Sequence, residues 1–289
     1  MNANHAVEVI ERMDSKAARV VTACTPSAKM VWRRWGEGRP VILLHGGAGS
    51  WMHWIRNIDA LARTRTVWAP DIPGFGDSDL PSENLDADTL APYVLRGALE
   101  ILGGERFDLV GFSFGSLVAA VIAAQAPSTL ERLVLVSASG LGLARASPTF
   151  KPLRSVTDPE QRAEALRFNL HALMLNDPAN IDDLALAVQE RSALRERVRH
   201  RKLARTDILL RLAPQWRCAA YGIWGLRDVL YRDQMDPLTD RINALGLCEK
   251  AFLDRAGHWL QYECSDEFNR LLACFLTGRS TAPHSEQQP

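Results

Sequence analysis

Short apolar runs alternate with helix-patterned segments along most of this 289-residue chain. Runs such as Val41–Leu44 and Leu133–Val136 are apolar throughout, which indicates strands buried on both faces, as in a parallel sheet. Strands that alternate with helices along the chain predict a doubly wound α/β fold, with a mostly parallel central sheet flanked by helices. The expected strands are residues 19–23, 29–35, 41–44, 65–69, 107–110, 133–136, 220–224 and 250–253. The expected helices lie near residues 52–62, 87–102, 115–126, 234–245 and 265–277.

The alternation is interrupted between residues 141 and 214, where the pattern is helical and rich in arginine. We expect residues 141–214 to form an inserted helical lid over a core made of residues 1–140 and 215–279. The arginines of this segment are expected to lie mainly on solvated helix faces. Residues 280–289 are polar and contain proline, which predicts a disordered tail.

Composition excludes several classes of function. The formal net charge is zero and the pI is about 7.1, so no nucleic-acid partner is expected. The five cysteines are scattered without a C-x-x-C pair, which favours reduced thiols in a cytoplasmic protein over disulfides. Residues 1–5 do not combine a basic segment with an apolar one, so no signal peptide is expected. No apolar run approaches the roughly 20 residues that cross a bilayer. No His, Cys or carboxylate cluster has ligand spacing, so neither a metal nor an organic cofactor is expected. Homo-oligomerisation is left open.

The segment Gly111-Phe112-Ser113-Phe114-Gly115 joins an expected strand to a helix of small residues. A serine on such a sharp turn holds its hydroxyl clear of the sheet, and the flanking glycines allow the backbone to turn tightly. The pattern alone occurs by chance in roughly one chain of this length in ten. Its place between a strand and a helix makes Ser113 a candidate nucleophile.

Asp228 and His258 also follow expected strands, and the chain order is Ser113, Asp228, His258. The carboxyl ends of parallel strands lie at one edge of a sheet, so the three loops are expected to converge. His258 would accept the proton of Ser113, and Asp228 would fix the imidazole tautomer. Asp254 lies too close in sequence to His258 to come from a separate loop. We therefore predict a Ser-His-Asp triad.

A glycine-rich loop, residues 45–50, directly follows the expected strand at 41–44. Such a loop exposes backbone N–H groups that can stabilise a developing negative charge on oxygen. We expect the N–H groups of Gly47 and of Phe114, the residue after the serine, to form an oxyanion hole.

Over roughly residues 18–277 the chain resembles the α/β-hydrolase superfamily. Besides the predicted triad, Asp71-Ile72-Pro73-Gly74-Phe75-Gly76-Asp77-Ser78 is similar to the D-x-P-G-x-G-x-S loop of that superfamily. The resemblance implies a lid inserted after the strand that ends near Val136. A serine at position 113 distinguishes the chain from epoxide hydrolases and haloalkane dehalogenases, in which an aspartate is the nucleophile.

The motifs are most similar to those of meta-cleavage-product hydrolases, which cleave a carbon–carbon bond in dienoic acids from aromatic degradation. Residues 257–263 and 266–269 resemble the G-H-W-x-Q-x-E segment of these enzymes and the helix after it, and residues 133–142 resemble the entry to their lid. Trp259 is therefore expected either to line the substrate pocket beside the histidine or to pack in the core. Arg191 is a candidate for a bidentate contact with a substrate carboxylate.

Two features depart from that family. Phe112 stands where an asparagine is usual before the nucleophile, and the loop at 45–50 is shorter. Together with nearby aromatic residues, Phe112 favours a largely apolar pocket. We therefore expect a serine hydrolase of a small-molecule carboxylic ester or acyl substrate, with C–C hydrolysis of a 2-hydroxy-6-oxo-dienoate as the alternative. A non-catalytic ligand-binding protein and a cofactor-free dioxygenase stay open, because a fold alone decides neither.

Overall fold

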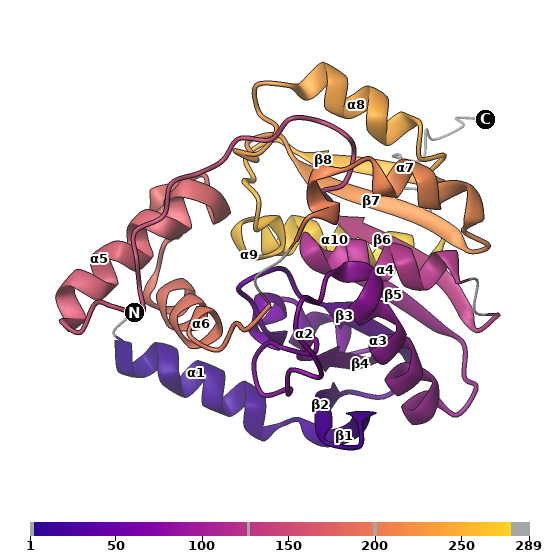
Figure 1. Cartoon of the computed structure of the whole chain (residues 1–289), viewed down its shortest axis with the longest axis horizontal. Coiled ribbons are helices and arrows are strands. Elements are labelled where there is room, and N and C mark those ends of the chain that lie inside the picture. Colours follow the sequence, from indigo (N-terminus) through magenta and orange to yellow (C-terminus); the bar gives the residue numbers. More distant parts are fainter. Residues whose placement is uncertain (1–2, 126–127, 199–200, 279–289) are drawn as a thin grey trace, which may run out of the picture.

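The computed structural model describes residues 3–125, 128–198 and 201–278 (Figure 1). Its centre is an eight-stranded sheet in the order β1-β2-β4-β3-β5-β6-β7-β8. The first two strands pair antiparallel with their neighbours, and all later pairings are parallel. The strands are β1 Ala18–Thr25, β2 Ala28–Trp35, β3 Arg39–Leu44, β4 Arg65–Pro70, β5 Phe107–Phe112, β6 Leu130–Val136, β7 Ala219–Gly225 and β8 Glu249–Leu253.

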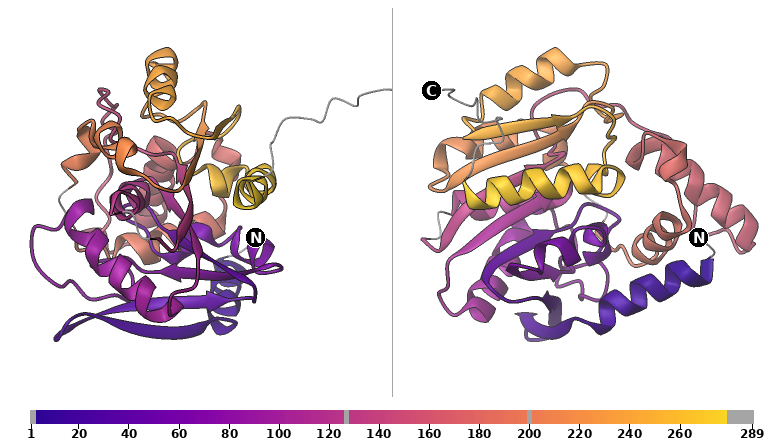
Figure 2. Two further views of the ribbon diagram at one scale, coloured as in Figure 1. Left: turned by 90° about the vertical axis from the view of Figure 1, so that its right-hand side faces the viewer. Right: turned by 180° about the vertical axis from the view of Figure 1, so that it is seen from behind.

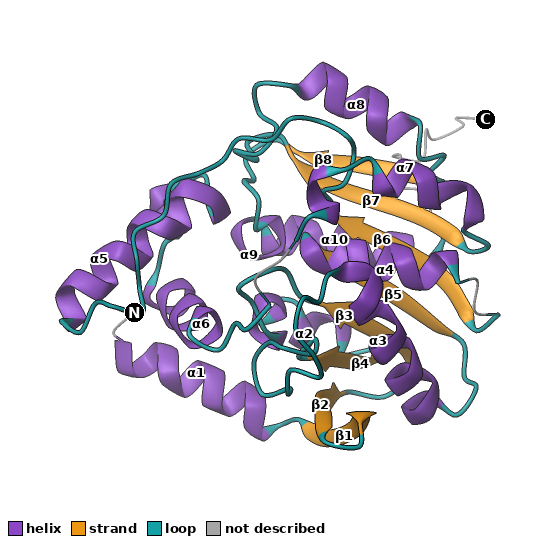
Figure 3. Cartoon of the chain, viewed as in Figure 1, coloured by secondary structure: helices purple, strands orange, loops and turns teal. Residues whose placement is uncertain are grey.

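Helices cover both faces of the sheet (Figures 2 and 3), as the prediction of an α/β fold requires. One hydrophobic cluster joins the sheet to helices on one face, and these helices are α3 Ala87–Leu102, α4 Phe114–Ala124, α7 Ile208–Leu212 and α8 Met235–Asn243. A second cluster joins the other face to α2 Ile58–Leu61, α9 Leu260–Glu263 and α10 Ser265–Thr277. Burial of strands such as β3 and β5 from both sides explains their unbroken apolar sequences. The fold class is confirmed.

Two local predictions differ from the structure. The helix expected near residues 52–62 is instead a 3-10 turn, Trp51–Trp54, followed by the single-turn helix α2. An N-terminal helix, α1 Ala3–Ser15, was not expected. Its apolar face belongs to the same buried cluster as side chains of α6 Asp183–Ala193, and the two helices lie side by side in Figure 1.

The segment predicted to be a lid contains α5 Pro159–Asn169, a π-helical turn Leu170–Met174, and α6, besides short 3-10 turns. It also contains α7, which packs against α4 on the face of the sheet. Residues 143–157, at its start, contain no helix. The division into a core of residues 1–140 and 215–279 and a lid of 141–214 stays a prediction. Helix α1, which belongs to the first part of the predicted core, packs against α6 of the predicted lid. The tail predicted at 280–289 lies outside the described residues.

Candidate active site

Ser113 occupies the sharp turn between β5 and α4. Its backbone has φ 52° and ψ −113°, a conformation that non-glycine residues rarely adopt and that the surroundings must hold in place. The Ser113 N–H donates to the carbonyl oxygen of Val136 at 2.8 Å. A Cβ atom on Gly115 would lie 2.4 Å from the carbonyl oxygen of Leu44, and one on Gly111 would lie 2.4 Å from that of Gly115. Both glycines are therefore required by close backbone packing.

Three side chains predicted to converge form a continuous hydrogen-bonded chain. His258 Nε2 lies 2.8 Å from Ser113 Oγ, and His258 Nδ1 lies 2.7 Å from Asp228 Oδ2. The other carboxylate oxygen, Oδ1, accepts the N–H of Leu230 at 3.0 Å. A carboxylate can only accept, so Nδ1 carries the proton and Nε2 is free to accept one from the serine hydroxyl. This arrangement can activate Ser113 as a nucleophile.

The glycine-rich loop after β3 is held by two buried histidines. His45 Nε2 accepts the N–H of Ile72 at 2.9 Å, and His53 Nδ1 accepts the N–H of Gly46 at 3.2 Å. Burial lowers the pKa of His45, and it lowers the pKa of His53 well below 6.5, so both rings are neutral at pH 7 and can accept these bonds. The sequence did not single out His53, and no local pattern distinguishes it.

The predicted oxyanion-hole residues Gly47 and Phe114 line the same cavity as Ser113 and His258. Within the described part of the chain, neither of their backbone N–H groups donates to another group. Phe114 is the first residue of α4, where a helix leaves its N–H groups without an intrahelical acceptor. Both N–H groups are thus available to an oxygen atom bound beside the serine.

The D-x-P-G-x-G-x-S loop supports this region and does not line the cavity. Asp71 is buried, and its carboxylate accepts the N–H groups of Trp51 and Asp77, both at 2.9 Å. It also accepts a hydrogen bond from the buried Arg33 at 3.1 Å. A Cβ atom on Gly76 would lie 2.4 Å from the Asp71 carboxylate, so the glycine allows the loop to wrap around that side chain.

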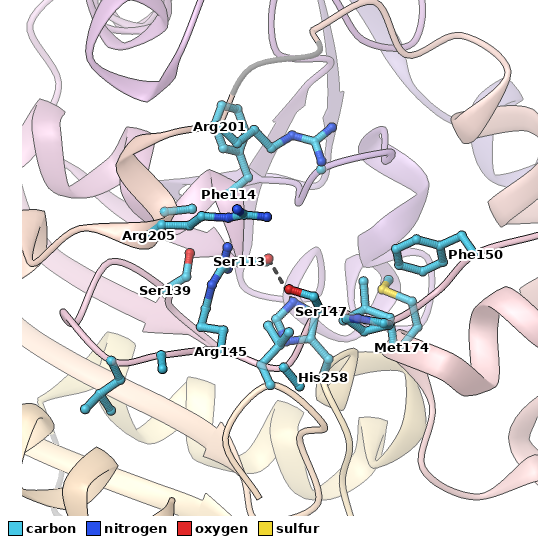
Figure 4. Close-up of a pocket in the computed structure, with 18 of the residues that line it drawn as sticks. Ser113, Phe114, Ser139, Arg145, Ser147, Phe150, Met174, Arg201, Arg205 and His258 are labelled. Carbon is cyan, nitrogen blue, oxygen red and sulfur yellow. Dashed lines mark hydrogen bonds between the residues drawn. The ribbon is translucent and has the colours of Figure 1, made fainter.

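A cavity of about 710 Å³ opens above Ser113 and is strongly cationic. Figure 4 shows the side chains of Arg145 and Arg205 directed toward Ser113, with Arg201 beside Phe114 at the edge of the same cavity. Lys202 lines the same cavity. The expectation of a largely apolar pocket is therefore wrong. The remaining lining residues are Gly47, Phe112, Ser113, Phe114, Ser139, Leu143, Ala144, Ala146, Ser147, Pro148, Phe150, Leu173, Met174, Ala204, Leu230 and His258.

These cations have few anionic partners. Among the described residues, Arg145, Lys202 and Arg205 form no ion pair, whereas Arg201 pairs with Glu196. Burial lowers the pKa of Arg145, and the neighbouring Arg205 lowers it further. Burial also lowers the pKa of Arg201, to about 10. With a pKa of about 10, Arg201 is still a cation at pH 7. The Nε atoms of Arg145 and Arg201 are buried without a hydrogen-bond partner.

Neither Trp259 nor Arg191 lines this cavity. The structure places Trp259 in the core, the second of its two expected positions, and the prediction for Arg191 is wrong. Trp259 is fully buried, stacks on Tyr262 with ring centroids 4.2 Å apart, and donates its indole N–H to the carbonyl oxygen of His53 at 2.9 Å. Arg191 lies on α6, with its guanidinium 3.7 Å from the carboxylate of Glu11 on α1. Trp259 is thus a core residue, and Arg191 helps to join the two helices.

Phe112 does line the cavity, although its ring is almost completely buried. The ring centroid lies 5.3 Å from that of His258 and 5.4 Å from that of His53. Phe112 therefore forms an apolar support beside the histidine. The sequence analysis did not predict that four cations line this cavity, namely Arg145, Arg201, Lys202 and Arg205. Only the packing of residues 141–214 brings them to Ser113.

The model of the alpha/beta hydrolase fold family matches residues 39–263. The chain belongs to this family. A 2-hydroxy-6-oxo-6-phenylhexa-2,4-dienoate hydrolase of Comamonas testosteroni is 30% identical over 294 residues, which cover 94% of this chain and 99% of the relative. The predicted relationship to meta-cleavage-product hydrolases is confirmed, and membership of a family of hydrolases supports an enzymatic function.

Solved structures of hydrolases have a similar fold. A meta-cleavage product hydrolase from Pseudomonas fluorescens is 26% identical, with a TM-score of 0.70 and coverage of 91% of this chain and 99% of that one. A carboxylesterase from Bacillus subtilis is 19% identical, with a TM-score of 0.73 and coverage of 96% and 99%; this likeness concerns the fold alone. In the described part of the chain, no helix is both long and apolar enough to span a membrane.

Proposed function

We propose that this protein is a serine hydrolase that cleaves a small acyl compound bearing an anionic group. The observation that carries the proposal is the hydrogen-bonded chain from Ser113 through His258 to Asp228, at the floor of a cavity large enough for a small molecule. The base lies within hydrogen-bond distance of both the nucleophile and the orienting carboxylate, as covalent catalysis requires.

The proposed reaction follows from this geometry. His258 Nε2 takes the hydroxyl proton while Ser113 Oγ attacks the substrate carbonyl carbon, and the carbonyl oxygen becomes an oxyanion. The N–H groups of Gly47 and Phe114 stabilise that charge. The imidazolium, stabilised by Asp228, then protonates the leaving group. In a second cycle His258 takes a proton from water, which attacks the acyl carbon. The bond from that carbon to Ser113 Oγ breaks, His258 returns the proton to Oγ, and the carboxylic acid is released.

The charge of the cavity supports an anionic substrate. Gathering Arg145, Arg201, Lys202 and Arg205 around one space is unfavourable unless an anion balances them. Guanidinium groups bind carboxylates through strong, charge-assisted hydrogen bonds. A neutral ester would leave Arg145, Lys202 and Arg205 without an anionic partner, whereas an ester or acyl compound bearing a carboxylate would pair with them.

Two bond types fit this proposal. Hydrolysis of a carboxylate-bearing ester is the first candidate, because Phe112 supplies an apolar wall where the C–C hydrolases usually have an asparagine. C–C hydrolysis of a 2-hydroxy-6-oxo-dienoate is the second, and it is favoured by the Comamonas testosteroni relative, which matches almost end to end. The substrate named for that relative also carries a carboxylate.

Ester and C–C hydrolysis are separated by a substrate panel. Purified protein is assayed with p-nitrophenyl esters in neutral and carboxylate-bearing pairs of equal length, and with coloured ring-fission dienoates. The expected result is multiple turnovers, a higher kcat/KM for the carboxylate member of each pair, and loss of activity and of fluorophosphonate labelling in Ser113→Ala. Labelling that persists in Ser113→Ala contradicts the role of the serine.

The same measurements test the other functions of this fold. A single slow turnover with tight retention of the ligand would indicate a binding protein. Consumption of oxygen by Ser113→Ala would indicate a cofactor-free dioxygenase. A rate advantage for dienoates over every ester would place C–C hydrolysis first.

A further inference from the structure

The oxyanion loop contains one strained residue, Ala48. Its φ angle is 50°, in the left-handed region that non-glycine residues seldom occupy. Such a conformation persists only where neighbouring groups hold it. Ala48 directly follows Gly47, whose N–H is a proposed oxyanion donor, so the Ala48 N–H belongs to the peptide unit immediately after that donor.

The group that holds Ala48 comes from the lid segment. The Ala48 N–H donates to Oε1 of Glu196 at 3.0 Å, across 148 residues of sequence. Glu196 lies just after α6, and its side chain is 22% exposed. A hydrogen bond from an amide to a carboxylate in a partly buried site is stronger than one between neutral groups. Glu196 therefore fixes the peptide unit next to the oxyanion donor.

Arg201 ties the same carboxylate to both oxyanion residues. Its guanidinium pairs with Glu196 Oε1. It also rests on Gly47, because a Cβ atom there would lie 2.7 Å from Arg201 Cζ. The guanidinium carbon lies 5.7 Å from the ring centroid of Phe114, and Figure 4 shows the two side chains together. The pair thus packs against the loop at Gly47 and Ala48.

We propose that Glu196 is a positioning residue, which holds the oxyanion loop in its active conformation through the Ala48 N–H, with Arg201 keeping its carboxylate in place. The inference rests on the proposed serine hydrolase function. The core would then supply the donors Gly47 and Phe114 of the oxyanion hole, and the lid segment would supply the side chains that hold them in place. Removal of Glu196 would release the peptide unit between Gly47 and Ala48, so the loop could relax and the Gly47 N–H would no longer be held toward the substrate oxygen.

Separate contacts dock the same segment on the core, and they provide a control. Arg195 pairs with Asp77, and the backbone N–H of Arg197 donates to the carbonyl oxygen of Gly74 at 2.9 Å. Neither contact touches residues 45–50. Loss of the Arg195 ion pair should weaken this docking contact and leave the oxyanion loop in place, whereas loss of Glu196 should affect oxyanion stabilisation.

The experiment compares wild type with Glu196→Ala, Glu196→Gln and Arg195→Ala, using p-nitrophenyl butyrate and a trifluoromethyl ketone, whose adduct with serine mimics the oxyanion. Thermal denaturation establishes that each variant is folded. We expect Glu196→Ala to lower kcat about 10- to 100-fold with little change in KM, and to weaken the ketone by a similar factor. Glu196→Gln retains an oxygen acceptor for Ala48 and should stay within about fivefold of wild type. Arg195→Ala should match wild type.

Two results would overturn the inference. One is unchanged ketone affinity in Glu196→Ala, because an effect on the oxyanion must alter both measurements. The other is an equal loss in Glu196→Ala and Arg195→Ala, which would show general loosening of the lid segment. Failure of the proposed function looks different: wild type itself would neither hydrolyse the ester nor react with a fluorophosphonate.

Discussion

Replacement of Asp228 by asparagine gives a sharp test of the proposed site, because the structure determines how the amide must lie. One carboxylate oxygen accepts from Nδ1 of His258 at 2.7 Å, and the other accepts the backbone N–H of Leu230 at 3.0 Å. In Asp228→Asn, the amide oxygen must face the Leu230 N–H, since the opposite orientation sets two donors against each other. The amide NH₂ then faces Nδ1.

An NH₂ group facing Nδ1 stabilises the tautomer in which Nε2 carries the proton. That nitrogen can no longer accept the proton of Ser113, so the base is lost although every side chain stays in place. Loss of the correct tautomer in Ser-His-Asp enzymes costs about 10,000-fold in rate, or about 5.5 kcal/mol of transition-state stabilisation. We expect a loss of this order in Asp228→Asn.

The assay measures kcat for an activated ester and the second-order rate constant for fluorophosphonate labelling. Asp254→Asn is the matched control, because Asp254 is an exposed acid four residues before His258, and it should behave as wild type. Retention of more than about a tenth of wild-type activity by Asp228→Asn would refute the assigned hydrogen-bond geometry, as would an equal loss in the Asp254 variant.

Three further predictions follow from the same structure. Arg205→Met should raise KM about tenfold for a carboxylate-bearing ester and leave its neutral counterpart unchanged in steady-state assays, whereas Arg191→Met should change neither, because that guanidinium faces α1. Gly115→Ala should lower the free energy of unfolding in urea by about 3 kcal/mol or more, since its Cβ would lie 2.4 Å from a backbone oxygen; a wild-type midpoint would contradict the packing. Burial lowers the pKa of His53 below 6.5, so below that pH the unfolded chain binds more protons than the folded one. The free energy of unfolding should therefore fall by up to about 1.4 kcal/mol per pH unit as the pH drops from 6.5. Urea titrations should show a smaller dependence on pH in His53→Gln.

The parts of the site that follow from local sequence were predictable. An unbroken apolar strand, a glycine-flanked serine and a helix of small residues specify the turn at Ser113, and the topology of a parallel sheet brings the ends of β5, β7 and β8 to one edge. That rule alone placed Asp228 and His258 near the serine. It needs no knowledge of side-chain packing, because the carboxyl ends of parallel strands are adjacent in any such sheet.

The parts that depend on packing between distant segments were not predictable. Trp259 is adjacent to His258 in sequence, yet its indole turns into the core, where the carbonyl oxygen of His53 accepts its N–H. Arg191 lies in the expected lid, but the unpredicted helix α1 offers its guanidinium a carboxylate at Glu11. In both cases the orientation of a side chain was decided by a partner far away in the sequence.

The cations around Ser113 show why this difference matters for chemistry. A composition with no net charge gave no sign of them, because a zero sum says nothing of where charges gather. Arg201 and Arg205 resembled solvated arginines of a helix face, and Arg145 lies in a stretch without helix. Only the docking of residues 141–214 places them together, and burial then lowers the pKa of Arg145 and of Arg201. The cations around Ser113 repel one another, and an anionic substrate would relieve this repulsion as it binds. Assays with neutral esters alone should therefore underestimate the catalytic capacity of this protein.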